Sequence, residues 1–159
     1  MKFSGFLSVI ISLILFNNIY SQPGDFDEER DYSISKIPFS LLVEAGAIIR
    51  LHHTRFEIEN EKNAVHQVRK AVTIFNKEEQ DYGQLSLWYN KFRTIEEIEG
   101  IIYDSNGDEV RELEEKDIKD YSDFNGSLFD ENRFKYAELY YDKYPYTVEF
   151  IYEIYHDGY

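Results

Sequence analysis

The amino-acid sequence predicts an all-β protein, an antiparallel β-sandwich-like domain with one or two short helical turns. Segments rich in Val, Ile, Phe, Thr and Tyr recur along the chain and are separated by turn residues. No segment carries a long helical repeat, and 159 residues, 43% of them hydrophobic, suffice for one ordinary domain. Short strands joined by turns are typical of sandwich folds.

Residues 1–21 have the pattern of a secretory signal peptide. Lys2 supplies a positive start, an apolar run extends from Phe6 to Phe16, and Ser21 ends a short polar stretch. A transmembrane helix needs roughly 20 apolar residues, about twice the length of this run. We therefore predict a periplasmic or secreted protein that does not span the membrane after cleavage. An uncleaved N-terminal anchor is the alternative.

Residues 22–31 predict an acidic flexible leader, because Phe26 is their one large apolar residue among five carboxylates. Residues 32–159 are then assigned to a single β-sandwich-like domain. Near its start, Ile37–Leu42 predicts one short helical turn, since Pro38 suits the first position of a helix and Gly46 lies just beyond the end.

Two long strands with a hairpin connection are predicted next, at Ala47–Glu59 and Ala64–Phe75. The apolar residues of the first strand change phase partway along it. They fall on odd positions at Ile49 and Leu51 and on even positions at Phe56 and Ile58. A one-residue shift in a period of two predicts a β-bulge, which we place near His52 and His53.

Further strands are predicted at Leu85–Tyr89 and Ile98–Tyr103, although residues 94–97 also fit a helix capping box. Residues 104–107 read Asp-Ser-Asn-Gly, and Asn-Gly supplies the two positive φ angles of a tight hairpin turn. The returning strand would be Val110–Leu113. A calcium loop is disfavoured, because its glycine should stand at the sixth position and Gly107 is at the fourth.

The charged residues 114–121 predict a short helix or loop, and Phe134–Tyr141 and Thr147–Tyr155 predict the last strands. The final strand alternates apolar and polar residues, which is typical of a half-exposed antiparallel strand. Asp157-Gly158 then gives a turn signal with no returning strand. The sequence therefore predicts either an edge strand or a domain whose C-terminal strands are missing.

Composition excludes several functions. With 17 basic and 31 acidic residues the formal net charge is −14, which opposes binding to nucleic acid. The absence of Cys rules out disulfides, thiolate metal sites and a cysteine nucleophile. His52 and His53, as neighbours on a strand, point to opposite faces and do not suit one metal ion. We predict no enzyme activity and no catalytic, cofactor-binding or metal-binding residues.

Tyrosine is the most distinctive feature, with 14 residues in the chain. The candidate binding surface consists of Tyr140, Tyr141, Tyr144, Tyr146 and Tyr152. Aromatic faces beside carboxylates suit contact with a sugar or a protein. The alternative is a sheet whose tyrosines cover the core. A hydrolase that uses paired carboxylates, such as Glu149 with Glu153, is the least favoured class, since 31 acidic residues produce such pairs by chance.

Six segments occur in an order that carries a family resemblance. They are residues 47–51 (AIIRL), 68–77 (VRKAVTIFNK), 82–83 (YG), 104–107 (DSNG), 116–120 (KDIKD) and 144–149 (YPYTVE). Together they resemble the domain of unknown function that precedes a transglutaminase-like domain in exported proteins of Gram-negative bacteria. The likeness covers about residues 32–159.

This resemblance implies an all-β accessory domain, followed in the relatives by a papain-like core with a Cys, His and Asp triad. No triad residue carries over to this chain, which has no Cys. The expected function is that of a non-catalytic exported accessory domain, in scaffolding or substrate presentation, whose partner is a C-terminal transglutaminase-like domain. The alternative is a stand-alone module that binds envelope glycan or protein.

Overall fold

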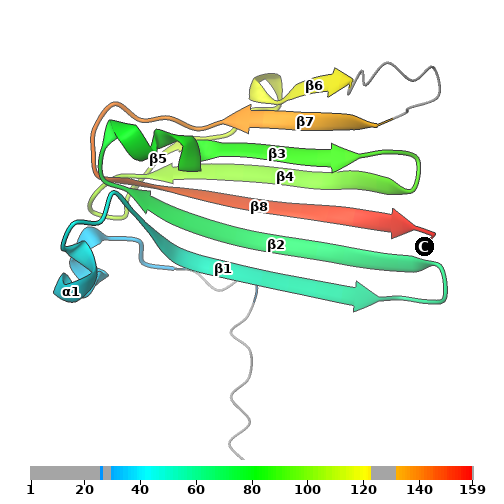
Figure 1. Ribbon diagram of the computed structural model, residues 1–159, viewed down its shortest axis with the longest axis horizontal. Coiled ribbons are helices and arrows are strands. Elements are labelled where there is room, and N and C mark those ends of the chain that lie inside the picture. Colours follow the sequence, from blue (N-terminus) through cyan, green and yellow to red (C-terminus); the bar gives the residue numbers. More distant parts are fainter. Residues whose placement is uncertain (1–25, 27–29, 123–131, 159) are drawn as a thin grey trace, which may run out of the picture.

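The computed structural model describes residue 26, residues 30–122 and residues 132–158. The expected signal peptide and most of the expected leader lie outside these residues. The described strands are β1 (Ala47–Ile58), β2 (Asn63–Ile74), β3 (Gln84–Tyr89), β4 (Arg93–Tyr103), β5 (Glu109–Glu112), β6 (Lys119–Ser122), β7 (Arg133–Glu138) and β8 (Tyr146–Asp157). They form a five-stranded sheet in the order β1-β2-β8-β4-β5 and a three-stranded sheet in the order β3-β7-β6 (Figure 1).

All strand pairs in both sheets are antiparallel. Helical structure among the described residues is limited to short pieces. These are α1 (Phe39–Leu42) and the 3₁₀ turns η1 (Ile34–Lys36), η2 (Lys77–Gly83) and η3 (Glu115–Asp117). The prediction of an all-β, two-sheet fold with short helical turns is confirmed.

The hairpin of β1 and β2 forms as predicted, with Ala47 opposite Ile74 at one end and Ile58 opposite Ala64 at the other. Its bulge lies at Arg50, between Ile49 and Leu51, and the predicted position near His52 and His53 is wrong. The reason lies in the contacts of Arg50, whose guanidinium donates to the carbonyl oxygens of residues 31–33. The bulge turns this side chain toward the N-terminal segment.

The turn from β4 to β5 differs in type from the prediction. The carbonyl of Asp104 accepts a hydrogen bond from Gly107 N at 3.0 Å, and Gly107 alone in this turn has a positive φ, of 89°. The Asp104 carboxylate accepts from the backbone N–H of Asn106 and Asp108. This side-chain acceptor replaces the second positive φ expected at Asn106. The helix alternative for residues 94–97 is wrong, because they lie in β4.

β8 occupies the centre of the five-stranded sheet, between β2 and β4 (Figure 1). It pairs along its length with β2, from Tyr146 to Asp157, and with β4, from Thr147 to His156. The expectation of an edge strand without a partner is therefore wrong. The alternating carboxylates that suggested a solvent-facing strand include Glu149, which is 1% exposed.

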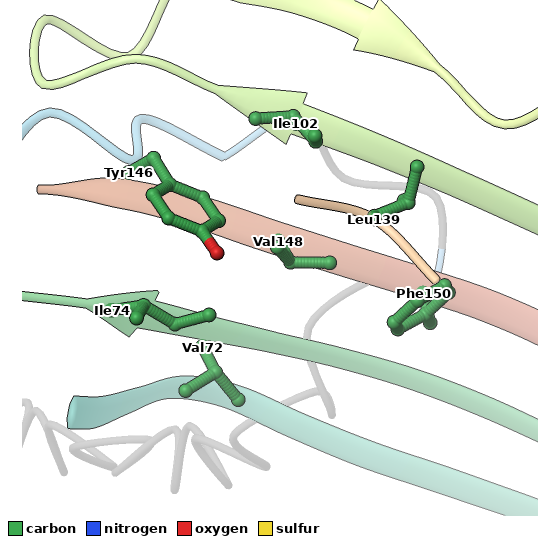
Figure 2. Packing of buried hydrophobic residues seen from close by; sticks show 7 residues of the cluster. All are labelled: Val72, Ile74, Ile102, Leu139, Tyr146, Val148 and Phe150. Carbon is green, nitrogen blue, oxygen red and sulfur yellow. The ribbon is translucent and has the colours of Figure 1, made fainter. Parts of the chain in front are cut away.

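The main core lies between one face of the five-stranded sheet and the segment that leaves β7. Figure 2 shows its side chains, from β2, β4, β8 and the residue after β7: Val72, Ile74, Ile102, Leu139, Tyr146, Val148 and Phe150. Leu139 is fully buried and lies directly over Gly100, where an added Cβ would meet Leu139 Cδ1 at 2.7 Å. Its backbone N donates to Gly83 O at 2.8 Å. Gly83 and Gly100 thus allow Leu139 to pack closely.

The opposite face of this sheet holds the N-terminal segment through a buried polar network centred on Glu149. One carboxylate oxygen accepts from Tyr32 Oη at 2.5 Å and from Arg69 Nε at 2.6 Å, and the other accepts from Tyr103 Oη at 3.0 Å. Burial and the adjacent Glu149 raise the pKa of Tyr32 and of Tyr103 well above the ordinary value. Both phenols therefore remain neutral donors.

Arg69 extends this network to residue 26. Its Nη1 donates to Phe26 O at 2.7 Å, and the Phe26 ring lies 5.1 Å from the His53 ring between centroids. Phe26 is 5% exposed. This one apolar residue of the expected leader is therefore an anchor against the sheet.

Candidate functional site

The five tyrosines of the expected binding surface do not share one face. Tyr146 is fully buried in the core, and its burial raises its pKa to about 12. Tyr141 and Tyr144 pack on it, with ring centroids at 6.1 Å and 5.3 Å. Tyr140 and Tyr152 line two different clefts. The structure thus separates residues that crowd together in the sequence.

The two faces of the five-stranded sheet differ in charge. Residues opposite each other in a ladder share a face, so the strand register assigns each side chain to one side. We call one side of this sheet the open face. On the four longest strands of the sheet, the open face carries Ala47, Ile49, His52, Thr54, Phe56, Ile58, Ala64, His66, Val68, Lys70, Val72, Ile74, Arg93, Ile95, Ile98, Gly100, Ile102, Tyr146, Val148, Phe150, Tyr152, Ile154 and His156.

None of these described open-face residues is Asp or Glu, although the chain has 31 acidic residues. The acidic side chains of the same strands that pair in register lie on the opposite face: Glu57, Glu97, Glu99, Glu149, Glu153 and Asp157. Among the described residues, no Lys, Arg or His side chain of the open face therefore has a carboxylate opposite it in the strand pairing. Nine hydrophobic residues of this face, Val72, Ile102 and Tyr146 among them, are buried in the core, and the part that remains exposed is apolar and basic.

A cleft of about 240 Å³ opens on this face beside η2 and β3. Its lining is His52, Lys70, Val72, Tyr82, Gln84, Leu85, Val148, Phe150 and Tyr152. We call it the Lys70 cleft, because Lys70 is the one charged residue in this lining and its Nζ lies 5.9 Å from the centroid of the Tyr82 ring. Four apolar side chains and several hydrogen-bonding groups give the mixed lining that ligand pockets have.

An aromatic and imidazole cluster continues the open face beyond the cleft. The rings of Phe56, His66 and His156 lie 5.8 to 6.4 Å apart between centroids. Phe56 is 53% exposed, and its neighbour Ile58 is 66% exposed. His156 Nε2 is buried and has no hydrogen-bond partner within the part of the chain that the structure describes.

In the described part of the chain, no group of three or more His, Asp or Glu side chains is placed to hold a metal ion. Burial, the neighbouring His156 and Arg93 lower the pKa of His66 below its ordinary value, and burial and Arg93 lower the pKa of His156. The positive charge of Arg93 disfavours a metal ion at the two histidines for the same reason that it disfavours their protonation.

These pKa shifts predict a loss of stability on acidification. The unfolded chain binds more protons than the folded one as the pH falls through about 6.5, the ordinary value for histidine. The contribution of these two histidines to the free energy of unfolding should therefore decrease between about pH 7.5 and pH 5 and level off below their lowered folded-state pKa values. Urea titrations across this range measure the decrease.

The control is the double substitution His66→Gln with His156→Gln, which keeps polar side chains of similar size and removes both imidazoles. Carboxylate titration is common to both proteins, so the difference between the two pH profiles isolates the histidines. The variant should lose less stability on acidification than the parent protein does. Identical profiles would contradict the assignment.

A second cleft, of about 270 Å³, lies beside the three-stranded sheet. It is lined by Arg111, Lys116, Asp117, Lys119, Tyr136, Glu138 and Tyr140. Two of its cations already have acidic partners, Arg111 with Asp117 at 2.9 Å and Lys116 with Glu114 at 2.6 Å. Because its charges are largely matched internally, this cleft is less available to a charged ligand than the Lys70 cleft.

Sequence reasoning missed Lys70, His52 and Tyr82 as neighbours. A period-two pattern shows which residues of one strand share a face, but it does not show which strands lie side by side. The usable signal was the basic and imidazole character of the even positions in β1 and β2. This pattern identifies a shared face only when β8, which lies far along the chain, is known to pair with β2.

No helix among the described residues has the length and apolar character needed to cross a membrane. A comparison with curated proteins finds no match. A crystal structure from Parabacteroides distasonis ATCC 8503, of a protein described as a "putative protease", matches with a TM-score of 0.61 and 13% sequence identity. The match covers 71% of this chain and 23% of that chain, so the shared fold is less than a quarter of the matched protein.

The sequence profile of one protein family matches residues 60–159, from the hairpin connection of β1 and β2 through β8. These residues include most of both sheets, the core around Leu139, and much of the lining of the Lys70 cleft. The match extends over more than half of the sequence. The chain therefore belongs to DUF3857, the family described as a Domain of Unknown Function with solved-structure structure.

Proposed function

We propose that this chain is a non-catalytic accessory domain of an exported transglutaminase-like protein and that it scaffolds or presents substrate to a separate catalytic domain. One observation carries the proposal: the fold matches 23% of a longer chain whose description names a protease. A domain that recurs as a minor part of a larger protein is typical of an accessory unit. The family resemblance supplies the transglutaminase-like partner and the exported location.

The chemistry of the chain agrees with a supporting role. A thiol nucleophile is absent from the sequence. Glu149, the most buried carboxylate described, accepts hydrogen bonds on both oxygens, from Tyr32, Arg69 and Tyr103, in a structural network. Glu153, its companion in the carboxylate-pair hypothesis, accepts a hydrogen bond from Gln67 at 2.7 Å.

Thiol labelling of the native product tests this proposal. An antibody raised against the purified chain should precipitate, from the envelope fraction of the source organism, a polypeptide larger than the 19.0 kDa of this sequence. A thiol-directed probe should label that polypeptide. Since this sequence contains no Cys, any label must lie in another part of the same polypeptide.

The purified chain alone serves as the control and should show neither peptidase nor acyl-transfer activity. A native product of the size of this chain that takes up no thiol label would contradict the proposal. So would peptide cleavage by the purified chain.

A further inference from the structure

We propose that the Lys70 cleft and the exposed part of the open face beside it form a docking surface for a polypeptide segment with apolar side chains and a carboxylate, and that the carboxylate binds Lys70. The inference rests on the proposed function in taking the occupant to be a polypeptide substrate or partner segment. It names the chemistry that such a segment must have.

The charge of the occupant follows from the charge of the face. Lys70 and Arg93 are cationic, and the described open-face residues include no Asp or Glu that would neutralise them. A carboxylate brought to Lys70 meets a cation that lies over the Tyr82 ring and has no ion pair with any residue that the structure describes. Electrostatic complementarity of this kind selects the partner and its orientation.

The apolar character of the occupant follows from the lining of the cleft and from exposed side chains on β1. Ile49, opposite the cleft residue Val72, is 57% exposed, and Phe56 and Ile58, which lie farther along β1 and beyond the cleft, are 53% and 66% exposed. Valine, leucine and phenylalanine side chains line the cleft itself. An apolar surface beside a lone cation favours a ligand that places a carboxylate next to hydrophobic side chains.

Other occupants fit the charges less well. A second copy of the chain that met this face with its own open face would bring Lys70 and Arg93 against like charges. An anionic membrane or a nucleic acid would have to approach a protein of net charge −14. A single polypeptide segment covers less of the protein than a membrane or a nucleic acid does, and at the cleft the acidic neighbour in η2 is Asp81, whose carboxylate accepts a hydrogen bond from Gln84. The volume of about 240 Å³ suits one or two amino-acid residues of such a segment.

Binding of three blocked tetrapeptides to the full chain, measured by calorimetry, tests the inference. The peptides contain leucine and phenylalanine and differ at one position, which is glutamate, glutamine or lysine. We expect the glutamate peptide to bind about ten-fold more tightly than the glutamine peptide, and the lysine peptide to bind most weakly. Higher salt should reduce the difference between the peptides.

Reversing the charge of Lys70 should reverse the preference for the glutamate peptide over the lysine peptide. In Lys70→Glu the lysine peptide should bind more tightly than the glutamate peptide, and in Lys70→Gln the two should bind about equally well. Lys119→Glu is the matched control: it makes the same change in the second cleft and should leave the preference of the parent protein unchanged. Melting temperatures establish that each variant is folded before binding is compared.

Equal affinity of the parent protein for all three peptides would overturn the proposal, as would an equal effect of Lys119→Glu. The proposal would also fail if the chain co-sedimented with phosphatidylglycerol vesicles in a Lys70-dependent manner and bound no peptide, because the occupant would then be a lipid surface. These measurements use no catalytic domain. Their failure is therefore distinguishable from failure of the thiol-labelling experiment, which does not involve Lys70.

Discussion

Replacement of Glu149 with leucine should lower the free energy of unfolding by about 3–5 kcal/mol, the range observed when one partner of a buried ion pair is removed. Glu149 is 1% exposed, and its ion-pair partner Arg69 is 7% exposed. The substitution leaves the guanidinium of Arg69 and the phenols of Tyr32 and Tyr103 without their shared acceptor. Urea unfolding followed by circular dichroism measures the change.

Two further variants show whether the loss comes from the buried network. Glu153→Leu removes a carboxylate from the same face of β8 that is only partly buried, and it should cost less than about 1 kcal/mol. Arg69→Met combined with Glu149→Leu removes both charges and should be more stable than Glu149→Leu alone. A loss below about 1 kcal/mol for Glu149→Leu would contradict the central role of this carboxylate.

The same variant should loosen the N-terminal segment. Tyr32 and Phe26 reach the sheet through Glu149 and through its partner Arg69. Trypsin should therefore cleave after Lys36 faster in Glu149→Leu than in Glu153→Leu under native conditions. Equal cleavage rates in both variants would mean that Arg50, which binds the carbonyls of residues 31–33, holds the segment by itself.

The parts of the fold that the sequence predicted well depend on local information. The β1–β2 hairpin and the position of the β4–β5 turn, though not its type, are encoded within a few residues of chain, by alternating apolar positions and by turn residues around Gly107. The bulge was foreseen from the phase change, but its position at Arg50 was not. The contacts that fix it come from the N-terminal segment, about 17 to 19 residues earlier in the chain.

The parts that the sequence did not predict depend on long-range pairing. Alternation in β8 is compatible with either an edge strand or a central strand, and only the ladders with β2 and β4 distinguish them. Glu149 reads as a surface carboxylate until Tyr32, 117 residues away, is placed against it. The open face was not predicted for the same reason. Its lack of carboxylates can be seen only when four strands are aligned in register.

Replacement of Leu139 with alanine should lower the free energy of unfolding by about 2–5 kcal/mol, the usual cost of a cavity in a rigid core. Leu139 follows β7 and is fully buried against Gly100 and Phe150, and it joins the segment after the three-stranded sheet to the five-stranded sheet (Figure 2). The backbone around it is held by its hydrogen bond to Gly83, so the site has little freedom to collapse and fill the space.

Trp88, the single tryptophan of the chain, lies on β3 and reports on the three-stranded sheet by its fluorescence. In Leu139→Ala its unfolding transition should shift to lower urea together with the circular dichroism signal, because loss of this contact weakens the attachment of one sheet to the other. Leu139→Met keeps most of the volume and should cost less than about 1.5 kcal/mol. Leu41→Ala, at a leucine that is 53% exposed, should change stability by less than about 0.5 kcal/mol. If Leu139→Ala resembled Leu41→Ala, the two sheets would be held together by contacts other than those of Leu139, and its proposed role in joining them would be wrong.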